Sequence, residues 1–104
     1  DFVDRCLMLL RDGGEILFGD IPNNSMRKRF FASANGIAFQ RAYMDTNSHP
    51  ETSFNTIEAG SIDDSVISAI FSRCRAQGFH AWILPQARNL PMANRREDIL
   101  IRKP

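Results

Sequence analysis

The fold is decided by the stretch LLRDGGEILFGDIPN, residues 9–23. Apolar residues recur at helical spacing over residues 2–11, and Gly13-Gly14 supplies the left-handed conformation that favours a helix end. Residues 15–20 then predict a strand, because 16–18 form a continuous apolar run typical of a strand buried on both faces. A helix that ends in Gly-Gly and leads directly into a buried strand predicts one half of an α/β unit.

A second helix and two more strands follow after residue 60. Ser61, with Asp64 three residues later, is typical of a capping box, and helical apolar spacing continues from there to Gly78. Residues 79–84 predict a strand, and residues 98–102 predict a last, antiparallel one. We therefore expect an α/β fold: a three-stranded mixed sheet, with its first two strands parallel and its last antiparallel, and two main helices.

Two features indicate that this sheet is part of a larger one. With both helices on one face, the other face would meet water, which does not suit a strand buried on both sides. The chain also begins at Asp1, without Met and already inside an apolar helical pattern. We expect the 104 residues to be a piece of a longer protein.

Residues 21–60 form a long excursion between the first strand and the second main helix. A usual connection has about 4–6 residues, and excursions of this length are typically lids or recognition elements. Short helices are expected at Ser25 to Ser33 and within Ile37 to Met44.

Composition excludes several classes of protein. A chain of 104 residues supports one core, and a net charge of +1 argues against a nucleic-acid partner. No apolar run approaches the about 20 residues of a membrane span, and no signal peptide opens the chain. Cys6 and Cys74 are too few for a disulfide scaffold, and with His49 and His80 they lack zinc-ligand spacing. We expect a metal-free cytoplasmic domain whose cysteines pack in the core.

Candidate binding residues follow the first strand. In open α/β sheets, ligands bind outside the carboxyl ends of parallel strands, which here gives Asp20, Asn23 and Asn24. Asp20 would orient a hydroxyl or amine, and Asn23 would hydrogen-bond it. The alternative is that both residues cap the turn into the next helix.

Basic and aromatic residues add further candidates. Arg27 opens the run Arg-Lys-Arg-Phe-Phe, which suits a phosphate group or, alternatively, the solvated face of a short helix. Arg95 and Arg96 precede the last strand, where they would hold an anionic substrate or form salt bridges. Tyr43 and His49 are candidates for a general base, although a loop histidine beside a proline is more often simply exposed.

Residues 9–23 resemble the LL-x-x-GG-x-L-L-x-G-D segment of class I S-adenosylmethionine-dependent methyltransferases. In that family the segment is a helix, a Gly-Gly turn and the fifth strand, which follow the cofactor-binding half. Next in that family come an excursion, a helix and the sixth strand. The seventh strand then returns antiparallel between the fifth and sixth strands. The resemblance implies a partial Rossmann-like fold, with residues 1–104 as the C-terminal half and residues 21–60 as its acceptor-side excursion or lid.

The resemblance also implies an activity: methyl transfer from S-adenosylmethionine to an acceptor, which we expect to be a small molecule. The family holds its cofactor on a glycine-rich loop after the first strand. Here the six glycines, at positions 13, 14, 19, 36, 60 and 78, form no such cluster. We therefore expect no cofactor binding and no turnover by this chain alone, and the catalytic residues stay unassigned.

Two other interpretations are open. In the first, the chain is a stand-alone, non-enzymatic interaction module that completes its sheet by self-association, for example as a dimer. In the second, it is the distal half of another doubly wound enzyme, such as a nucleotide-sugar epimerase. The antiparallel ending argues against this last interpretation.

Overall fold

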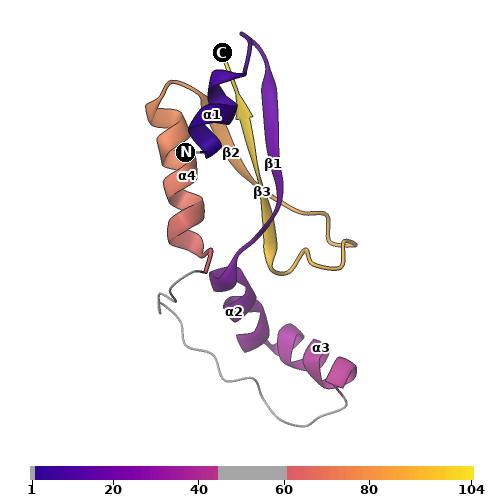
Figure 1. Cartoon of the computed structure of the whole chain (residues 1–104). Helices are drawn as coiled ribbons and strands as arrows, with labels where there is room; N and C mark the ends of the chain where they lie inside the picture. Colours follow the sequence, from indigo (N-terminus) through magenta and orange to yellow (C-terminus); the bar gives the residue numbers. More distant parts are fainter. Residues whose placement is uncertain (1, 45–60) are drawn as a thin grey trace.

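The computed structural model describes residues 2–44 and 61–104. Figure 1 shows the elements in chain order: α1 (Phe2–Met8), β1 (Glu15–Pro22), α2 (Asn24–Ala32), α3 (Ala34–Met44), α4 (Asp64–Ala76), β2 (His80–Pro85) and β3 (Arg96–Arg102). The described residues contain no helix that is long and apolar enough to cross a membrane.

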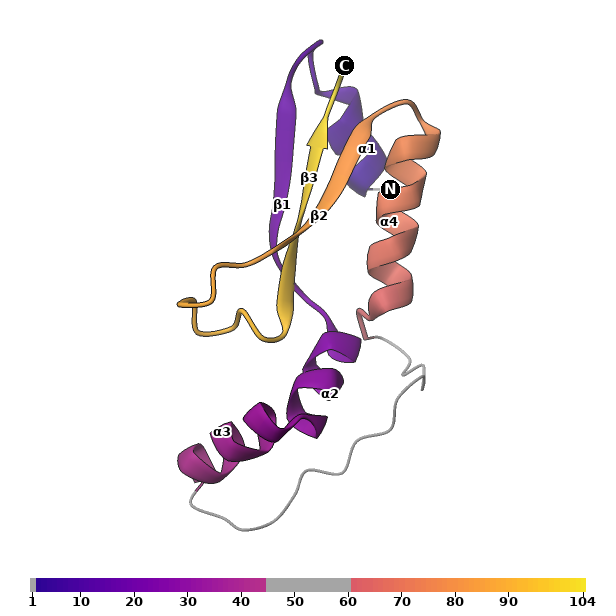
Figure 2. The same cartoon turned by 180° about the vertical axis from the view of Figure 1, so that it is seen from behind.

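The three strands form one sheet in the order β1-β3-β2. The last strand in the chain lies in the middle and is antiparallel to both neighbours (Figure 2), which confirms the expected antiparallel return. The expectation of a mixed sheet is wrong, because both hydrogen-bonded pairs of this sheet are antiparallel. β1 and β2 run in the same direction, but β3 separates them.

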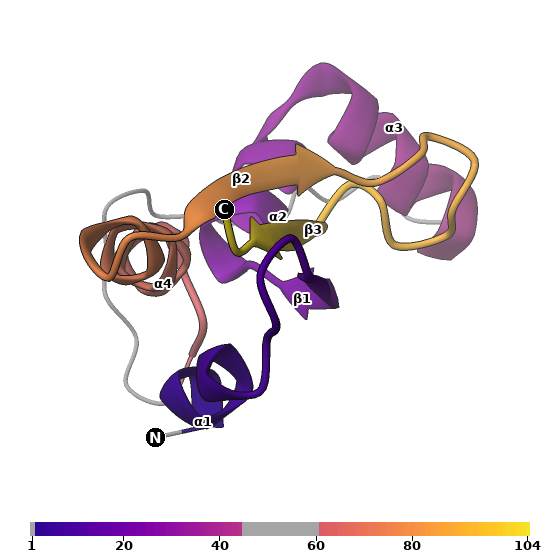
Figure 3. The same ribbon diagram turned by 90° about the horizontal axis from the view of Figure 1, so that it is seen from above.

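The core lies between the sheet and the helices α1 and α4, which lie on the same side of it (Figure 3). Its buried side chains come from both helices, from β2 and from the central strand β3; they are Leu7, Ile67, Cys74, Ala81, Ile99 and Ile101. Each fully buried aliphatic side chain contributes about 1.5–3 kcal/mol relative to its exposed state. Cys74 packs in the core as expected, whereas Cys6 is half-buried, and both are free thiols.

No helix of the described segments covers the other face of the sheet. Leu17, Leu100 and Trp82 lie directly opposite one another in register across the three strands, on that face. Leu17 is 55% exposed. The expectation that β1 is buried on both faces is therefore wrong for the described part of the chain, although Ile16 and Phe18 pack against the core.

The ends of α4 confirm one prediction and correct another. Gly78 has a φ of +93° just after the helix, in the left-handed conformation expected of it. The N-cap is Asp63 rather than Ser61: the Asp63 carboxylate accepts the backbone N–H groups of Ser65 and Val66. The carbonyl of Ile62 accepts the Asn24 N–H at 2.8 Å, which keeps residue 62 outside the helix.

The first helix is shorter than its apolar pattern predicts. It ends at Met8 rather than residue 11, because the N–H groups of Leu9 and Leu10 donate to carbonyls only three residues back. Gly13 does adopt a φ of +75°, but its N–H donates to the Lys103 carbonyl at 2.9 Å. The Gly-Gly turn therefore joins the end of the sheet instead of capping the helix.

The excursion contains both expected short helices. α2 and α3 meet at Ser33 and extend beyond the end of the sheet (Figure 1). Gly36 makes their close approach possible, because a Cβ there would lie 1.8 Å from the Phe30 carbonyl oxygen. Strand pairing also runs further than predicted, to Pro22 opposite Arg96.

Candidate functional site

A β-bulge aims Asp20 out of the first strand. The register between β1 and β3 shifts between Phe18 and Ile21, which leaves one extra residue in β1. Asp20 has a φ of 60°, which side chains rarely adopt, and its N–H donates to Asp98 Oδ1 at 2.8 Å. The bulge therefore presents the Asp20 carboxylate at the carboxyl end of β1.

Arg96 at the start of β3 and Gln86 just after β2 hold this carboxylate, and Asp98 accepts the Asp20 N–H; we call Asp20, Gln86, Arg96 and Asp98 the Asp20 cluster. Arg96 Nη1 donates to Asp20 Oδ2 at 2.6 Å, and Gln86 Nε2 donates to Asp20 Oδ1 at 3.0 Å. Gln86 Nε2 also lies 3.3 Å from Asp98 Oδ1. Asp20 remains 61% exposed, so an approaching molecule has access to its oxygens.

The Asp20 cluster stabilises the ionised carboxylate. The hydrogen bond from Gln86 has the largest effect on the pKa of Asp20 and lowers it. Burial acts in the opposite direction, but the charge and the hydrogen bond of Arg96 also lower the pKa, which therefore lies below its ordinary value. A carboxylate of lowered pKa is a weak base but a good hydrogen-bond acceptor. This environment suits orienting a donor group better than removing a proton.

Asn23 is a structural residue. Its side chain is buried, caps α2 by accepting the N–H groups of Ser25 and Met26, and donates to Asp64 Oδ1 at 2.8 Å. The interpretation of Asn23 as a helix cap is therefore confirmed. Asp20, by contrast, belongs to the Asp20 cluster and caps no helix.

Three arginines line a shallow cavity of about 260 Å³ beside Asn23, which we call the arginine cavity. Arg27 comes from α2, while Arg95 and Arg96 come from the start of β3. Asn24 and Ser61 also line it. No carboxylate is among the described residues that line this cavity.

A buried aromatic ring positions two of these arginines. The Arg27 guanidinium carbon lies 5.0 Å from the centroid of the Phe31 ring, and that of Arg95 lies 5.6 Å from it. Phe31 is 9% exposed, so the ring is a fixed support. Neither Arg27 nor Arg95 forms an ion pair with any residue of segments 2–44 and 61–104.

The structure thus brings four of the six predicted site residues to one end of the sheet: Asp20, Asn23, Asn24 and Arg27. Tyr43 lies in α3, far along the chain from the bulge, and His49 lies outside the described residues. Gln86 and Asp98 were not predicted, and Phe31 was predicted only as a member of the Arg-Lys-Arg-Phe-Phe run. Two spacings in the sequence point to Asp98 and Phe31. Asp98 lies two positions after Arg96 and therefore on the same strand face, and Phe31 lies about one helical turn after Arg27.

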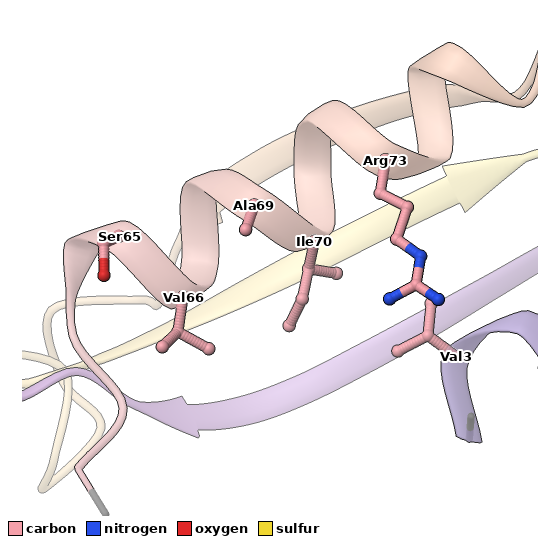
Figure 4. A pocket seen from close by; sticks show the side chains of 6 residues that line it. All are labelled: Val3, Ser65, Val66, Ala69, Ile70 and Arg73. Carbon is pink, nitrogen blue, oxygen red and sulfur yellow. The ribbon is translucent and has the colours of Figure 1, made fainter. Parts of the chain in front are cut away.

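Another cavity, of about 430 Å³, lies between α1 and α4 (Figure 4). Val66, Ile70 and Arg73 line it from α4 and Val3 lines it from α1; Arg73 also pairs with Asp4. The lining is mostly apolar and includes none of the predicted site residues. The described residues also contain no group of three His, Cys, Asp or Glu side chains placed to hold a metal ion.

Comparison with known proteins adds no assignment: no family model, no curated protein and no solved structure matches this chain.

Proposed function

We propose that this chain is the acceptor-side, C-terminal half of a class I S-adenosylmethionine-dependent methyltransferase, with a partial Rossmann-like fold. The reaction class is transfer of a methyl group to a small-molecule acceptor in the cytoplasm. In this proposal β1, β2 and β3 correspond to the family's fifth, sixth and seventh strands.

The observation that carries the proposal is the order β1-β3-β2, with β3 antiparallel between strands that run in the same direction. The resemblance of residues 9–23 implied this order in advance, because the family's seventh strand returns between the fifth and sixth. A simple meander would instead place the strands in chain order. Within the described segments no strand pairs with the outer edge of β1, and Leu17 is exposed; both observations support a sheet that continues in a longer chain.

The residues of this chain do not fit a complete cofactor site. A glycine-rich turn between a strand and a helix is required for close approach of the cofactor, and an acidic residue must bind its ribose. Gly13 and Gly14 instead precede β1 and join the end of β3, and Gly19 lies within the bulge. We therefore propose that the donor site belongs to residues outside this chain.

The contribution of this chain is to orient the acceptor. The exposed Asp20 carboxylate, held by Arg96 and Gln86, accepts a hydrogen bond from an acceptor hydroxyl or amine. Positioning of this kind is a large part of catalysis in transfer between two bound reactants. Because the pKa of the Asp20 carboxyl group is lowered, Asp20 serves as an orienting group rather than as a general base.

The reading frame upstream of Asp1 tests this assignment. We expect it to continue in frame and to encode a glycine-rich turn between a strand and a helix, followed by an acidic residue about 20 residues later. A frame that starts immediately before Asp1, or an upstream region without this pattern, would overturn the proposal.

The exposed sheet face favours a second candidate function, a non-enzymatic module that self-associates. Leu17 and Leu84 are 55% and 36% exposed on the face that no described helix covers, and β1 lies at an edge of the sheet with which no described strand pairs. This interpretation predicts a concentration-dependent dimer in sedimentation velocity, weakened by Leu17→Lys but not by Met8→Lys, an exposed apolar position on α1. A monomer at high concentration would exclude it.

A further inference from the structure

We propose that the arginine cavity binds an oxyanion, a phosphate or carboxylate group carried by the acceptor, through Arg27 and Arg95. That the anion belongs to a methyl acceptor rests on the proposed function; the anion site itself depends only on the geometry of this chain. It adds a substrate class, anionic small molecules, to the proposed methyl transfer.

The first support is the charge of the cavity. Three guanidinium groups and no carboxylate line it among the described residues. Arg96 is neutralised by Asp20 at 2.6 Å, whereas Arg27 and Arg95 have no ionic partner within the described segments. Two positive charges that share one cavity repel each other, and a bound anion relieves that repulsion.

The second support is preorganisation. Both guanidinium groups lie over the buried Phe31 ring, at 5.0 and 5.6 Å from its centroid, so their stems are held in place before any ligand binds. The Asn23 N–H donates to the Arg95 carbonyl at 2.9 Å, which fixes the backbone of the loop to the start of α2. Groups that are ordered in advance lose less entropy on binding.

The third support is the supply of donors. Arg95 donates Nε–H to Asn94 Oδ1 at 3.3 Å, which leaves its four terminal N–H groups for a ligand. Guanidinium forks match the oxygens of phosphate and carboxylate in paired hydrogen bonds. The cavity adjoins the Asp20 cluster through Arg96, so a molecule anchored by its anion would extend toward the Asp20 carboxylate.

The test is a titration of the whole 104-residue chain with inorganic phosphate and, separately, with acetate, at constant ionic strength made up with chloride. The readout is the backbone amide NMR shifts of residues around the cavity. We expect saturable shifts confined to residues 23–27 and 92–96. Stronger binding of phosphate indicates a phosphate-bearing acceptor, and stronger binding of acetate indicates a carboxylate.

Matched variants assign the effect to the cavity. Arg27→Gln and Arg95→Gln should each weaken binding about tenfold or more, as expected for the loss of a charge-assisted hydrogen bond. Arg88→Gln removes the same charge from an exposed loop position and should leave the affinity unchanged. Each variant keeps a folded amide spectrum, because none of the three side chains is buried.

Absence of saturable shifts with either anion, or equal weakening by all three variants, would overturn the anion site. That outcome leaves the methyltransferase proposal to its own test, the upstream reading frame. Conversely, an upstream frame without a donor site would refute the proposed function while saturable phosphate binding still established the anion site.

Discussion

The Asn23 side-chain amide donates to the Asp64 carboxylate at 2.8 Å, which links the end of β1 to the first turn of α4 across 41 positions of sequence. The same Asn23 oxygen caps α2, and the Asp64 carboxylate also pairs with Arg29 at 2.5 Å. The two boundaries of the long excursion are therefore held together by one buried residue and its partner. Asn23 also lines the arginine cavity.

Removing this link should destabilise the fold. Asn23→Ala is expected to lower the free energy of unfolding by about 1–3 kcal/mol, because it leaves the N–H groups of Ser25 and Met26 without their cap and removes the hydrogen bond to Asp64. Asn23→Ser should have an intermediate effect, since serine still caps α2 but does not reach Asp64. Asn89→Ala, in an exposed turn, is the control. Urea denaturation measures all three, and equal stability of Asn23→Ala and the control would contradict the role of Asn23.

The crossing of α2 and α3 depends on Gly36. Helix propensity alone predicts that Gly36→Ala stabilises the protein by about 1 kcal/mol. The added Cβ would lie 1.8 Å from the Phe30 carbonyl oxygen, so we expect a net loss of about 1–3 kcal/mol instead. Asn35→Ala, at an exposed position of the same helix, should change stability little. A stabilised Gly36→Ala variant in thermal unfolding would show that the helices do not approach this closely.

Truncating a side chain on the core face of the sheet should destabilise the protein more than truncating one on the opposite face. Ile99→Ala creates a cavity in the core and is expected to cost about 2–5 kcal/mol. Leu17→Ala removes a side chain that is 55% exposed, so its cost should be well below that of the core variant in denaturant unfolding. Comparable losses in the 104-residue chain would indicate that the second face is covered.

Acid should weaken the fold through four carboxyl groups. The pKa values of Asp4, Asp20, Asp63 and Asp64 are lowered from 3.8, chiefly by hydrogen bonds from Gln77, Gln86, Ser65 and Arg29, respectively. Below pH 3.8 the unfolded chain binds more protons at these sites than the folded chain. Their stabilisation is thus complete above that pH and is lost as the pH falls through the lower, folded values.

Urea denaturation at pH values between about 2.5 and about 7 measures this loss. The range spans the ordinary pKa of carboxyl side chains, about 4. Asp63→Asn keeps a helix cap but cannot ionise, so it should reduce the pH dependence while preserving much of the stability at neutral pH. An unfolding free energy that does not fall on acidification would contradict the assigned carboxylate contacts.

Local patterns predicted much of this fold. The α4 helix, its end at Gly78 and all three strands follow from apolar spacing and turn residues, which act over a few positions. Ser61 and Asp63 both qualify as caps by residue type; the choice of Asp63 depends on the Ile62 carbonyl, which contacts Asn24. Such a contact between distant residues leaves no local pattern.

The candidate site was predictable only in part, for the same reason. The rule that ligands bind at strand ends located Asp20, and the basic-aromatic run located Arg27; the fold does bring both to one end of the sheet. Gln86 and Asp98 reach Asp20 through pairing across strands, over 66 and 78 positions. The exposure of Leu17 likewise depends on which elements cover the sheet, and its apolar character alone does not reveal this.

The central claim is that this chain supplies the acceptor side of a methyltransferase whose donor site lies elsewhere. Its most direct test is calorimetric titration of S-adenosylmethionine into the 104-residue chain and into a chain extended upstream through its own reading frame. We predict saturable binding by the extended chain and none by residues 1–104. Saturable micromolar binding by residues 1–104 alone, or no binding by the extended chain, would contradict the claim.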